Sequence, residues 1–186
     1  MNLHRRLNVI VLSVLLLTGS ASCAAAPKGP LALASFTENF VTVSIALERD
    51  VNGAAILAAT FTPEKGHHLY SKDIPIDGLM GLGRPTLLEL TEESQMTALG
   101  DLVESVPAQE PDFDPKELLV YPTGPVSLKL PVQLPLGSDW IDDEVRITYM
   151  ACTAYQCKPP VEGRIVLVHI PGEKMFDSHR SMEANR

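Results

Sequence analysis

Two cysteines near the end of the chain have the residue type and the spacing for thiol–disulfide chemistry. Cys152 and Cys157 have four residues between them and are followed by Lys-Pro-Pro. They lie between the strand-like runs 144–151 and 161–170, so a tight turn would bring their Cα atoms within the roughly 4.4–6.8 Å that a disulfide needs. Such a bridge closes a loop of about six residues and would stabilise the fold by only about 2 kcal/mol, against about 4.7 kcal/mol for a loop of a hundred. The spacing therefore fits a reversible redox pair, and it also fits a structural lock on a turn.

The amino terminus indicates export. His4-Arg5-Arg6 is positively charged, residues 7–17 form an apolar run, and residues 18–26 are mostly small. This order is typical of a secretory signal peptide, here residues 1–26. The apolar run is shorter than the about 20 residues that span a bilayer, and prolines and charges interrupt every later apolar run. We therefore expect an exported protein in a compartment where disulfides persist, for which a bacterial periplasm is the best match.

A third cysteine, Cys23, lies within this cleavage region. The residues before it, Ser20-Ala21-Ser22, are small, as they are before the lipidated cysteine of bacterial lipoproteins. The aliphatic residue that usually stands three positions before that cysteine is missing. Two interpretations stay open: a lipoprotein signal that ends before Cys23, with a lipid anchor on that residue, or a cysteine that only happens to lie in the cleavage region. In both cases Cys152 and Cys157 remain as an isolated pair.

Composition and charge narrow the class of protein. Without residues 1–26 the chain has 160 residues, the length of one domain, which we place at 27–170 with a polar, frayed tail at 171–186. Thirteen basic and 23 acidic side chains then give a net charge of −10. Because no segment concentrates positive charge, nucleic acid and anionic membrane surfaces are poor candidates for partners. The whole chain is 45% hydrophobic, enough for a core, while its 15 prolines disfavour long helices.

Apolar and polar residues alternate with a period of two in much of the chain. The segments with this pattern are 41–47, 126–134 and 145–149. Asn52-Gly53 is a hairpin turn signal between the first of these and a strand at 54–61. The acidic, proline-containing segment 91–122 is typical of a long loop, with one helical turn at 92–102, and loops of that length are often functional. Short strands punctuated by Gly and Pro predict an all-β antiparallel sandwich.

Two blocks of sequence carry a resemblance to a known family. The first is Tyr149-Met-Ala-Cys152-Thr-Ala-Tyr-Gln-Cys157-Lys-Pro-Pro160, and the second is Gly66-His-His-Leu-Tyr70-Ser-Lys-Asp-Ile-Pro-Ile76, followed by a Gly- and Pro-containing segment at 78–90. The first resembles the active-site segment of the amino-terminal periplasmic domain of the thiol:disulfide interchange protein DsbD. The second resembles the stretch after the second strand of that domain. The resemblance covers about residues 36–170, and its specific part is the cysteine segment.

The resemblance implies both a fold and an activity. The fold is an immunoglobulin-like antiparallel β-sandwich with a long cap loop and with the cysteine pair on a hairpin at one edge. The activity is that of a thiol:disulfide oxidoreductase, which receives electrons from a membrane-embedded thiol reductant. Its recipients are a disulfide isomerase and periplasmic thioredoxin-like oxidoreductases, including those of cytochrome c maturation. Family members continue into a membrane domain and a thioredoxin-like domain, whereas this chain ends at Arg186, so we expect its reductant to be a separate protein.

Residue roles follow from the same resemblance. The second cysteine of the family forms the mixed disulfide, which assigns that role to Cys157 and the resolving role to Cys152. A phenylalanine on the cap loop shields the cysteines in the family, and Phe113, within the segment 110–115, stands at that place; otherwise it is an ordinary loop aromatic. Lys158 would favour a thiolate at Cys157, while the acidic residues at 110, 112 and 114 would oppose it if the cap packs close. The tyrosines that either line the site or are ordinary buried aromatics are Tyr70, Tyr149 and Tyr155.

Two other classes of function stay open. Thiolates together with Met150 and His67-His68 would suit Cu(I), although adjacent histidines normally point to opposite faces of a strand. A binding sandwich without redox activity, in which the disulfide only locks a turn, is the second alternative. No Ser/His/Asp set, phosphate-binding loop or nucleotide fingerprint stands out. We therefore expect no cofactor and no resident metal.

Overall fold

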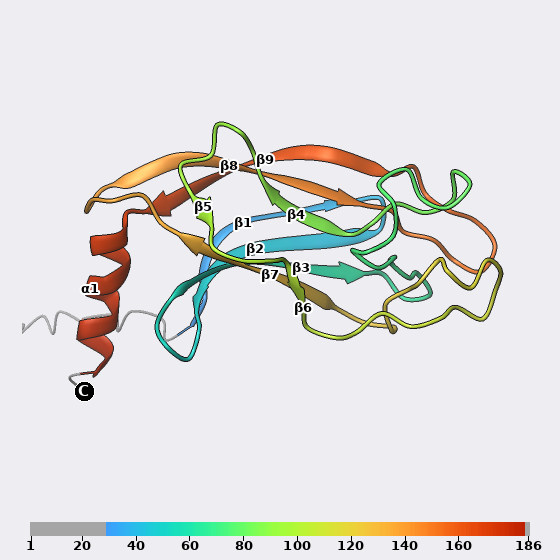
Figure 1. Ribbon diagram of the computed structural model, residues 1–186, viewed down its shortest axis with the longest axis horizontal. Coiled ribbons are helices and arrows are strands. Elements are labelled where there is room, and N and C mark those ends of the chain that lie inside the picture. The colour runs from blue at the N-terminus through green and yellow to red at the C-terminus, as the bar shows by residue number, and fades with distance from the viewer. Residues whose placement is uncertain (1–28, 185–186) are drawn as a thin grey trace, which may run out of the picture.

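The computed structural model describes residues 29–184, and its side chains as far as residue 178. Within this range the chain forms nine β-strands and one α-helix (Figure 1). The strands are β1 (Leu31–Glu38), β2 (Val41–Arg49), β3 (Ala55–Pro63), β4 (Leu87–Leu90), β5 (Thr97–Ala98), β6 (Val103–Glu104), β7 (Val126–Gln133), β8 (Trp140–Tyr149) and β9 (Val161–Pro171). The helix is α1 (Glu173–Ala184).

The strands form two antiparallel sheets that pack face to face. The larger sheet has the order β1-β2-β3-β7-β5, and β6 also pairs with β7; the smaller sheet has the order β4-β8-β9. Figure 1 shows the smaller sheet lying over the larger one. The predicted all-β, immunoglobulin-like antiparallel sandwich is confirmed, and the core fills the space between its two layers.

Alternating side chains explain why these segments are strands. In β2 the residues Val41, Val43, Ile45 and Leu47 are at most 1% exposed, while the residues between them face away from the core. Strand β7 repeats this pattern. Opposite them, Ile147 and Tyr149 of β8 are fully buried. The rings of Phe61 and Tyr149 meet edge to face across the layers, with centroids 5.8 Å apart. Period-two alternation presents one apolar face to a partner sheet, so the strands predicted from it are confirmed.

Strand β1 was not predicted from the sequence. It pairs with β2 from Leu31 to Glu38, and the two strands join through Asn39 and Phe40. Both residues have positive φ angles, 47° and 66°. A two-residue hairpin turn of type I′ requires positive φ at both positions, and Asn-Gly is its usual sequence signal. Phe40 replaces the glycine here, which explains why the turn carries no strong sequence signature.

The helical turn expected at 92–102 is wrong. The segment contains β5, and β6 follows at residues 103–104; both pair with β7. Leu99 also donates its backbone N–H to the Pro131 carbonyl over 2.9 Å. An edge strand presents unpaired backbone groups, and these short pairings satisfy them along the outer side of β7.

The frayed tail expected at 171–186 is also wrong. Strand β9 includes Pro171, and helix α1 follows at once. The side chain of Phe176 is only 7% exposed, and the Arg49 guanidinium lies 3.8 Å from the centroid of its ring. Arg49 also donates to the Phe176 carbonyl and forms an ion pair with Asp177 at 3.2 Å. A mostly polar segment is thus held as a helix by one buried aromatic residue, which local sequence does not reveal.

The two ends of the sandwich differ in character. Helix α1 lies at one end, and the long connections gather at the other, on the right in Figure 1. These are the β3–β4 connection, the loop between β6 and β7, and the hairpin between β8 and β9. Between residues 29 and 184 no helix is both long and apolar enough to cross a membrane. The predicted signal peptide, residues 1–26, and Cys23 within it lie outside the described residues.

Candidate redox site

A disulfide joins Cys152 to Cys157 on the hairpin between β8 and β9. Their Cα atoms are 4.0 Å apart, and the two residues face each other as an antiparallel bridge. The turn between them is ordered by Thr153, whose N–H donates to the Gln156 carbonyl over 2.8 Å. The Thr153 hydroxyl oxygen accepts from the N–H groups of Tyr155 and Gln156, at 3.2 Å and 3.1 Å. The predicted tight turn that closes the cysteine pair is therefore present, with the two Cα atoms slightly closer than the expected range of about 4.4–6.8 Å.

The two sulfur-bearing residues differ sharply in exposure. Cys152 is 1% exposed and belongs to a small second core. The other buried members of that core are Tyr70, Ile74, Leu118 and Val120. Cys157 is exposed to solvent. Because an attacking thiolate must reach the sulfur that it bonds, a large partner can approach Cys157 but not Cys152.

A third segment completes a small sheet around the disulfide. His68 donates its backbone N–H to the Cys152 carbonyl over 2.8 Å and accepts from the Cys152 N–H over 3.1 Å. Residues that face each other in an antiparallel pair direct their side chains to the same side, as do residues two apart along a strand. His68, Tyr70 and both cysteines therefore share one face, which we call the disulfide face. His67 and Lys158 belong to the reverse face.

Tyr70 supplies a hydrogen bond to the disulfide. Its hydroxyl donates to the Cys152 sulfur over 3.0 Å and lies 3.8 Å from the Cys157 sulfur. Burial raises the pKa of Tyr70 to about 12, so the hydroxyl keeps its proton near neutral pH. A donor at this distance would stabilise negative charge on the Cys152 sulfur once the disulfide opens.

The β3–β4 connection holds Tyr70 in place. The Thr86 hydroxyl donates to the Tyr70 carbonyl over 2.7 Å, and Tyr70 itself is 3% exposed. Gly83 passes directly against the ring: a Cβ at this position would lie 3.3 Å from Tyr70 Cγ and 2.9 Å from Leu118 Cδ1. Gly83 also has a φ of 75°. A larger residue here would be strained and would push against Tyr70.

The cap loop, residues 109–120, lies beside the disulfide face. Gln109 and Val120 close its base through reciprocal backbone hydrogen bonds of 2.9 Å, and Lys116 donates to the Pro111 carbonyl over 2.8 Å. The Phe113 ring lies 5.6 Å from the His68 ring, centroid to centroid, and the side chain is 37% exposed. The cap thus covers His68, next to the buried cysteine, while Cys157 stays exposed. The acidic residues at 110, 112 and 114 are exposed, and none of the interactions found among the described residues joins them to the disulfide face.

His68 is neutral at neutral pH in this position. Burial is the largest cause that lowers its pKa below 6.5, and the neighbouring His67 lowers it further. The His68 Nε2 atom is buried and has no hydrogen-bond partner among the described residues. The imidazole therefore resists protonation as long as the cap and the disulfide face are packed around it.

Acid should destabilise the fold through His68. The unfolded chain binds the proton near pH 6.5 and the folded chain only at lower pH, so the unfolding free energy should fall as the pH drops below about 6.5. Replacing His68 by Phe keeps an aromatic ring beneath Phe113 and removes the titrating group, so it should flatten this part of the pH profile. Denaturant unfolding between about pH 7.5 and pH 5 measures the change. An unchanged slope in both His68→Phe and His68→Gln would refute the assignment.

The β1–β2 turn braces the hairpin from the reverse face. Phe40 stacks on His67 with ring centroids 5.1 Å apart, and the Lys158 ammonium lies 4.3 Å from the centroid of the Phe40 ring. Asn39 donates its side-chain amide to the Pro159 carbonyl over 2.8 Å. The sequence left open whether Lys158 favours a thiolate at Cys157. In the structure the Lys158 ammonium lies against the Phe40 ring. These contacts were not predicted from the sequence, in which Asn39 is the available turn signal.

The other two candidate tyrosines occupy different surroundings. Tyr149 is fully buried in the main core, and its hydroxyl donates to the Glu38 carbonyl over 2.9 Å, so it does not line the disulfide face. Tyr155 stands at the tip of the hairpin and is 97% exposed. Of the three tyrosines considered from the sequence, Tyr70 is the one that contacts the sulfur atoms.

Metal binding gains no support from the geometry. Among the described residues no group of three or more His, Cys, Asp or Glu side chains is placed to hold a metal ion. His67 and His68 point to opposite faces, as expected for neighbours on a strand, so they do not converge on the cysteines. Of the residues considered for Cu(I), Met150 packs against the small core that contains Cys152, while His67 stacks on Phe40 at the reverse face.

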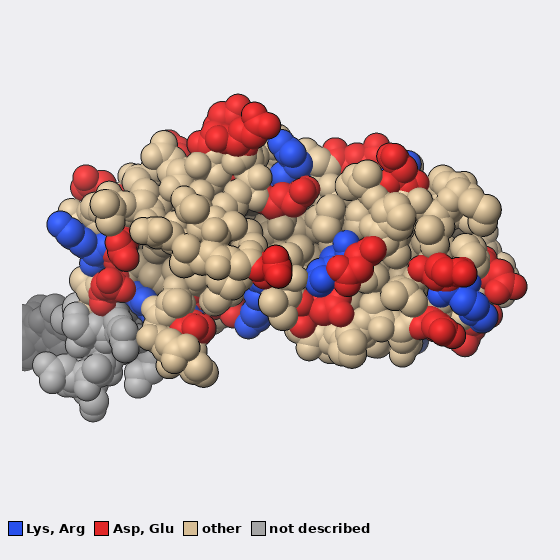
Figure 2. All heavy atoms as spheres, in the orientation of Figure 1, with Lys and Arg blue, Asp and Glu red and all other residues tan. Residues whose placement is uncertain are grey.

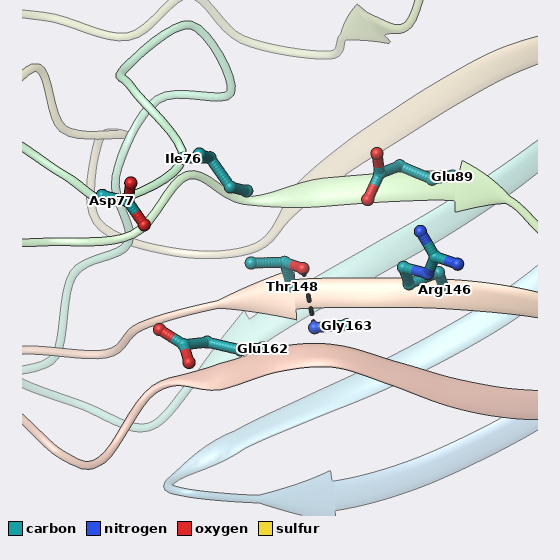
Figure 3. A pocket seen from close by; sticks show the side chains of 7 residues that line it. All are labelled: Ile76, Asp77, Glu89, Arg146, Thr148, Glu162 and Gly163. Carbon is teal, nitrogen blue, oxygen red and sulfur yellow. Dashed lines mark hydrogen bonds between the residues drawn. The ribbon is translucent and has the colours of Figure 1, made fainter.

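A pocket of about 380 Å³ lies away from the disulfide, on the outer face of the smaller sheet (Figure 3). Figure 3 shows Glu89 and Arg146 on neighbouring strands and Thr148 accepting a hydrogen bond from the N–H of Gly163, 3.0 Å long. Neither cysteine lines this pocket. On the face shown in Figure 2 acidic and basic side chains are interspersed, and Lys and Arg form no patch for a polyanion.

Comparisons with known proteins give one structural likeness. No family model and no curated protein matches the sequence. Among solved structures, the fold is similar to the crystal structure of the DsbD N-terminal domain of Neisseria meningitidis in the reduced form. The TM-score is 0.44 and the sequence identity 18%, over 72% of this chain and 86% of that chain. This likeness concerns the fold.

Proposed function

We propose that this protein is a thiol:disulfide oxidoreductase that relays electrons through Cys152 and Cys157. Its reductant would be a membrane-embedded thiol protein, and its recipients periplasmic thioredoxin-like or isomerase proteins. The observation that carries the proposal is the asymmetry of the disulfide: the Cys157 side is exposed, and the Cys152 sulfur is buried beside a hydroxyl donor. Export to the periplasm, with or without a lipid on Cys23, is part of the proposal and rests on the sequence of residues 1–26.

Reduction of the protein would take two exchange steps. A thiolate of the reductant attacks the sulfur of the exposed residue Cys157, the Cys152–Cys157 bond breaks, and Cys152 leaves as a thiolate. Tyr70 donates a hydrogen bond to this thiolate from the position that it already holds at 3.0 Å. The second thiolate of the reductant then attacks the reductant sulfur that is bonded to Cys157 in the mixed disulfide. This step releases Cys157 as a thiolate and leaves the reductant oxidised by two electrons.

Electron delivery would run in the opposite order. The Cys157 thiolate attacks the disulfide of the recipient and forms a mixed disulfide, while one recipient sulfur leaves as a thiolate. Cys152 then attacks the Cys157 sulfur, which restores the intramolecular disulfide and releases the recipient as a dithiol. The buried position of Cys152 suits this resolving step, because its target is the neighbouring sulfur and no other protein must reach it.

The fold should survive reduction of the disulfide. A bridge that closes so short a loop adds about 2 kcal/mol of stability, and the core strands do not depend on it. Parallel thermal or denaturant unfolding of the oxidised and reduced protein tests this expectation. The reduction potential, measured in glutathione buffers, should lie above about −300 mV, because exposed disulfides are the more easily reduced ones. A potential below that value, or a stability loss far above about 2 kcal/mol, would identify a structural lock on the turn.

A further inference from the structure

The hairpin tip presents an aromatic side chain beside the proposed reactive sulfur. Tyr155 lies two residues before Cys157 and is 97% exposed. Its backbone is fixed, because its N–H donates to the Thr153 hydroxyl and the turn is closed by the bond from Thr153 to Gln156. The ring is thus held out in water by an ordered turn.

Tyr155 differs from the other exposed aromatic residues at this end of the molecule. Phe113 lies against His68, and Phe40 lies between His67 and Lys158. Within residues 29–184 the ring and the hydroxyl of Tyr155 have no stacking or hydrogen-bond partner. Contacts inside the chain therefore explain the positions of the Phe113 and Phe40 rings. No such contact explains the position of the Tyr155 ring.

Covalent geometry decides what would cover this ring. A mixed disulfide brings the Cα atom of the partner cysteine to about 4.4–6.8 Å from the Cα of Cys157. The Cα of Tyr155 is at most about 7.6 Å from that of Cys157, since consecutive Cα atoms are about 3.8 Å apart. A protein bonded to Cys157 must then lay its own surface over or against the hairpin tip. A small dithiol bonded to the same sulfur would leave the Tyr155 ring in water.

We propose that Tyr155 is the docking residue by which this protein recognises a protein partner. The partner is a thioredoxin-like oxidoreductase that presents an apolar surface next to its own reactive cysteine. An aromatic ring supplies a large apolar contact area with few rotatable bonds, and tyrosine is enriched among the residues that dominate binding at protein interfaces. This inference rests on the proposed function, because it concerns the encounter that precedes the exchange at Cys157.

The test compares a protein reductant with a small one. The oxidised chain is mixed with a purified, reduced bacterial thioredoxin or with dithiothreitol, and the rate of opening of the Cys152–Cys157 bond is followed for Tyr155→Ala and Tyr155→Phe. For Tyr155→Ala we expect kcat/KM with thioredoxin to fall about tenfold or more, and Tyr155→Phe to retain most of it. The rate with dithiothreitol should stay unchanged in both. Leu136→Ala is the matched control, because it removes another 80% exposed apolar side chain and should change neither rate.

The outcomes separate this inference from the proposed function. An equal fall with thioredoxin and dithiothreitol would mean that Tyr155 only shapes the hairpin, which overturns the inference. Unchanged kinetics of Tyr155→Ala with thioredoxin would overturn it as well, while wild-type exchange would leave the proposed function standing. Failure of the wild-type protein to exchange with either reductant would overturn the proposed function, and the inference with it, before any variant is compared.

Discussion

A Cys152→Ser variant is expected to accumulate a covalent complex with a thioredoxin-like partner, and a Cys157→Ser variant is not. With Cys152 replaced, the exposed Cys157 thiolate can still attack the partner disulfide, but no neighbouring thiolate remains to release the partner. With Cys157 replaced, the remaining sulfur is that of Cys152, which is 1% exposed and lies under Tyr70. The expected difference is close to all or none. Non-reducing electrophoresis after mixing each variant with an oxidised partner measures it.

The control for this experiment is the double variant Cys152→Ser/Cys157→Ser, which should trap nothing. Each protein must also unfold cooperatively, so that exposure of Cys152 by misfolding is not taken for reactivity. Equal trapping by the two single variants would contradict the assignment of Cys157 as the partner-facing sulfur. Such a result would be compatible with thiol–disulfide exchange. It would show that burial of Cys152 does not decide which sulfur reacts with the partner.

A Phe113→Ala variant is expected to react faster with small oxidants while its fold stays intact. The Phe113 ring lies 5.6 Å from the His68 ring, beside the disulfide face. Aromatic pairs contribute about 0.5–1.5 kcal/mol beyond the area that they bury, so loss of this contact should raise the open population of the cap by about twofold to tenfold. Stopped-flow oxidation of the reduced protein by oxidised glutathione measures the rate. The unfolding midpoint should change little, because the cap lies outside the main core.

Phe113→Leu is the matched control, because it keeps an apolar side chain over His68 and should give an intermediate rate. In the structure the cap can protect Cys152 more than Cys157. Phe113 covers His68 next to Cys152, while Cys157 is already exposed in the oxidised state. Alkylation of the reduced protein, read at each cysteine by mass spectrometry, should therefore show the larger gain at Cys152. An unchanged thiol reactivity would show that the cap does not shield the thiols.

Local pattern was enough for the strands that line the main core. In β2 and β7 the buried and exposed positions alternate as the sequence predicts, because one apolar face per strand suffices to pack against a second sheet. The local pattern did not predict elements that depend on residues distant in the sequence. Strands β5 and β6 form by pairing with β7, and α1 is held where Phe176 meets Arg49. None of these three elements carried a sequence signal of its own.

The candidate site divides in the same way. Four residues between two cysteines, flanked by strand-like runs, determined by themselves that a short hairpin would carry a disulfide. Only the tertiary structure decided that one cysteine is buried and the other exposed, and that Tyr70, 82 residues from Cys152, donates to its sulfur. The bond from Asn39 to Pro159 spans 120 residues. Such contacts depend on the register of segments that meet only when the two sheets pack, and side-chain alternation within one strand carries no information about that register.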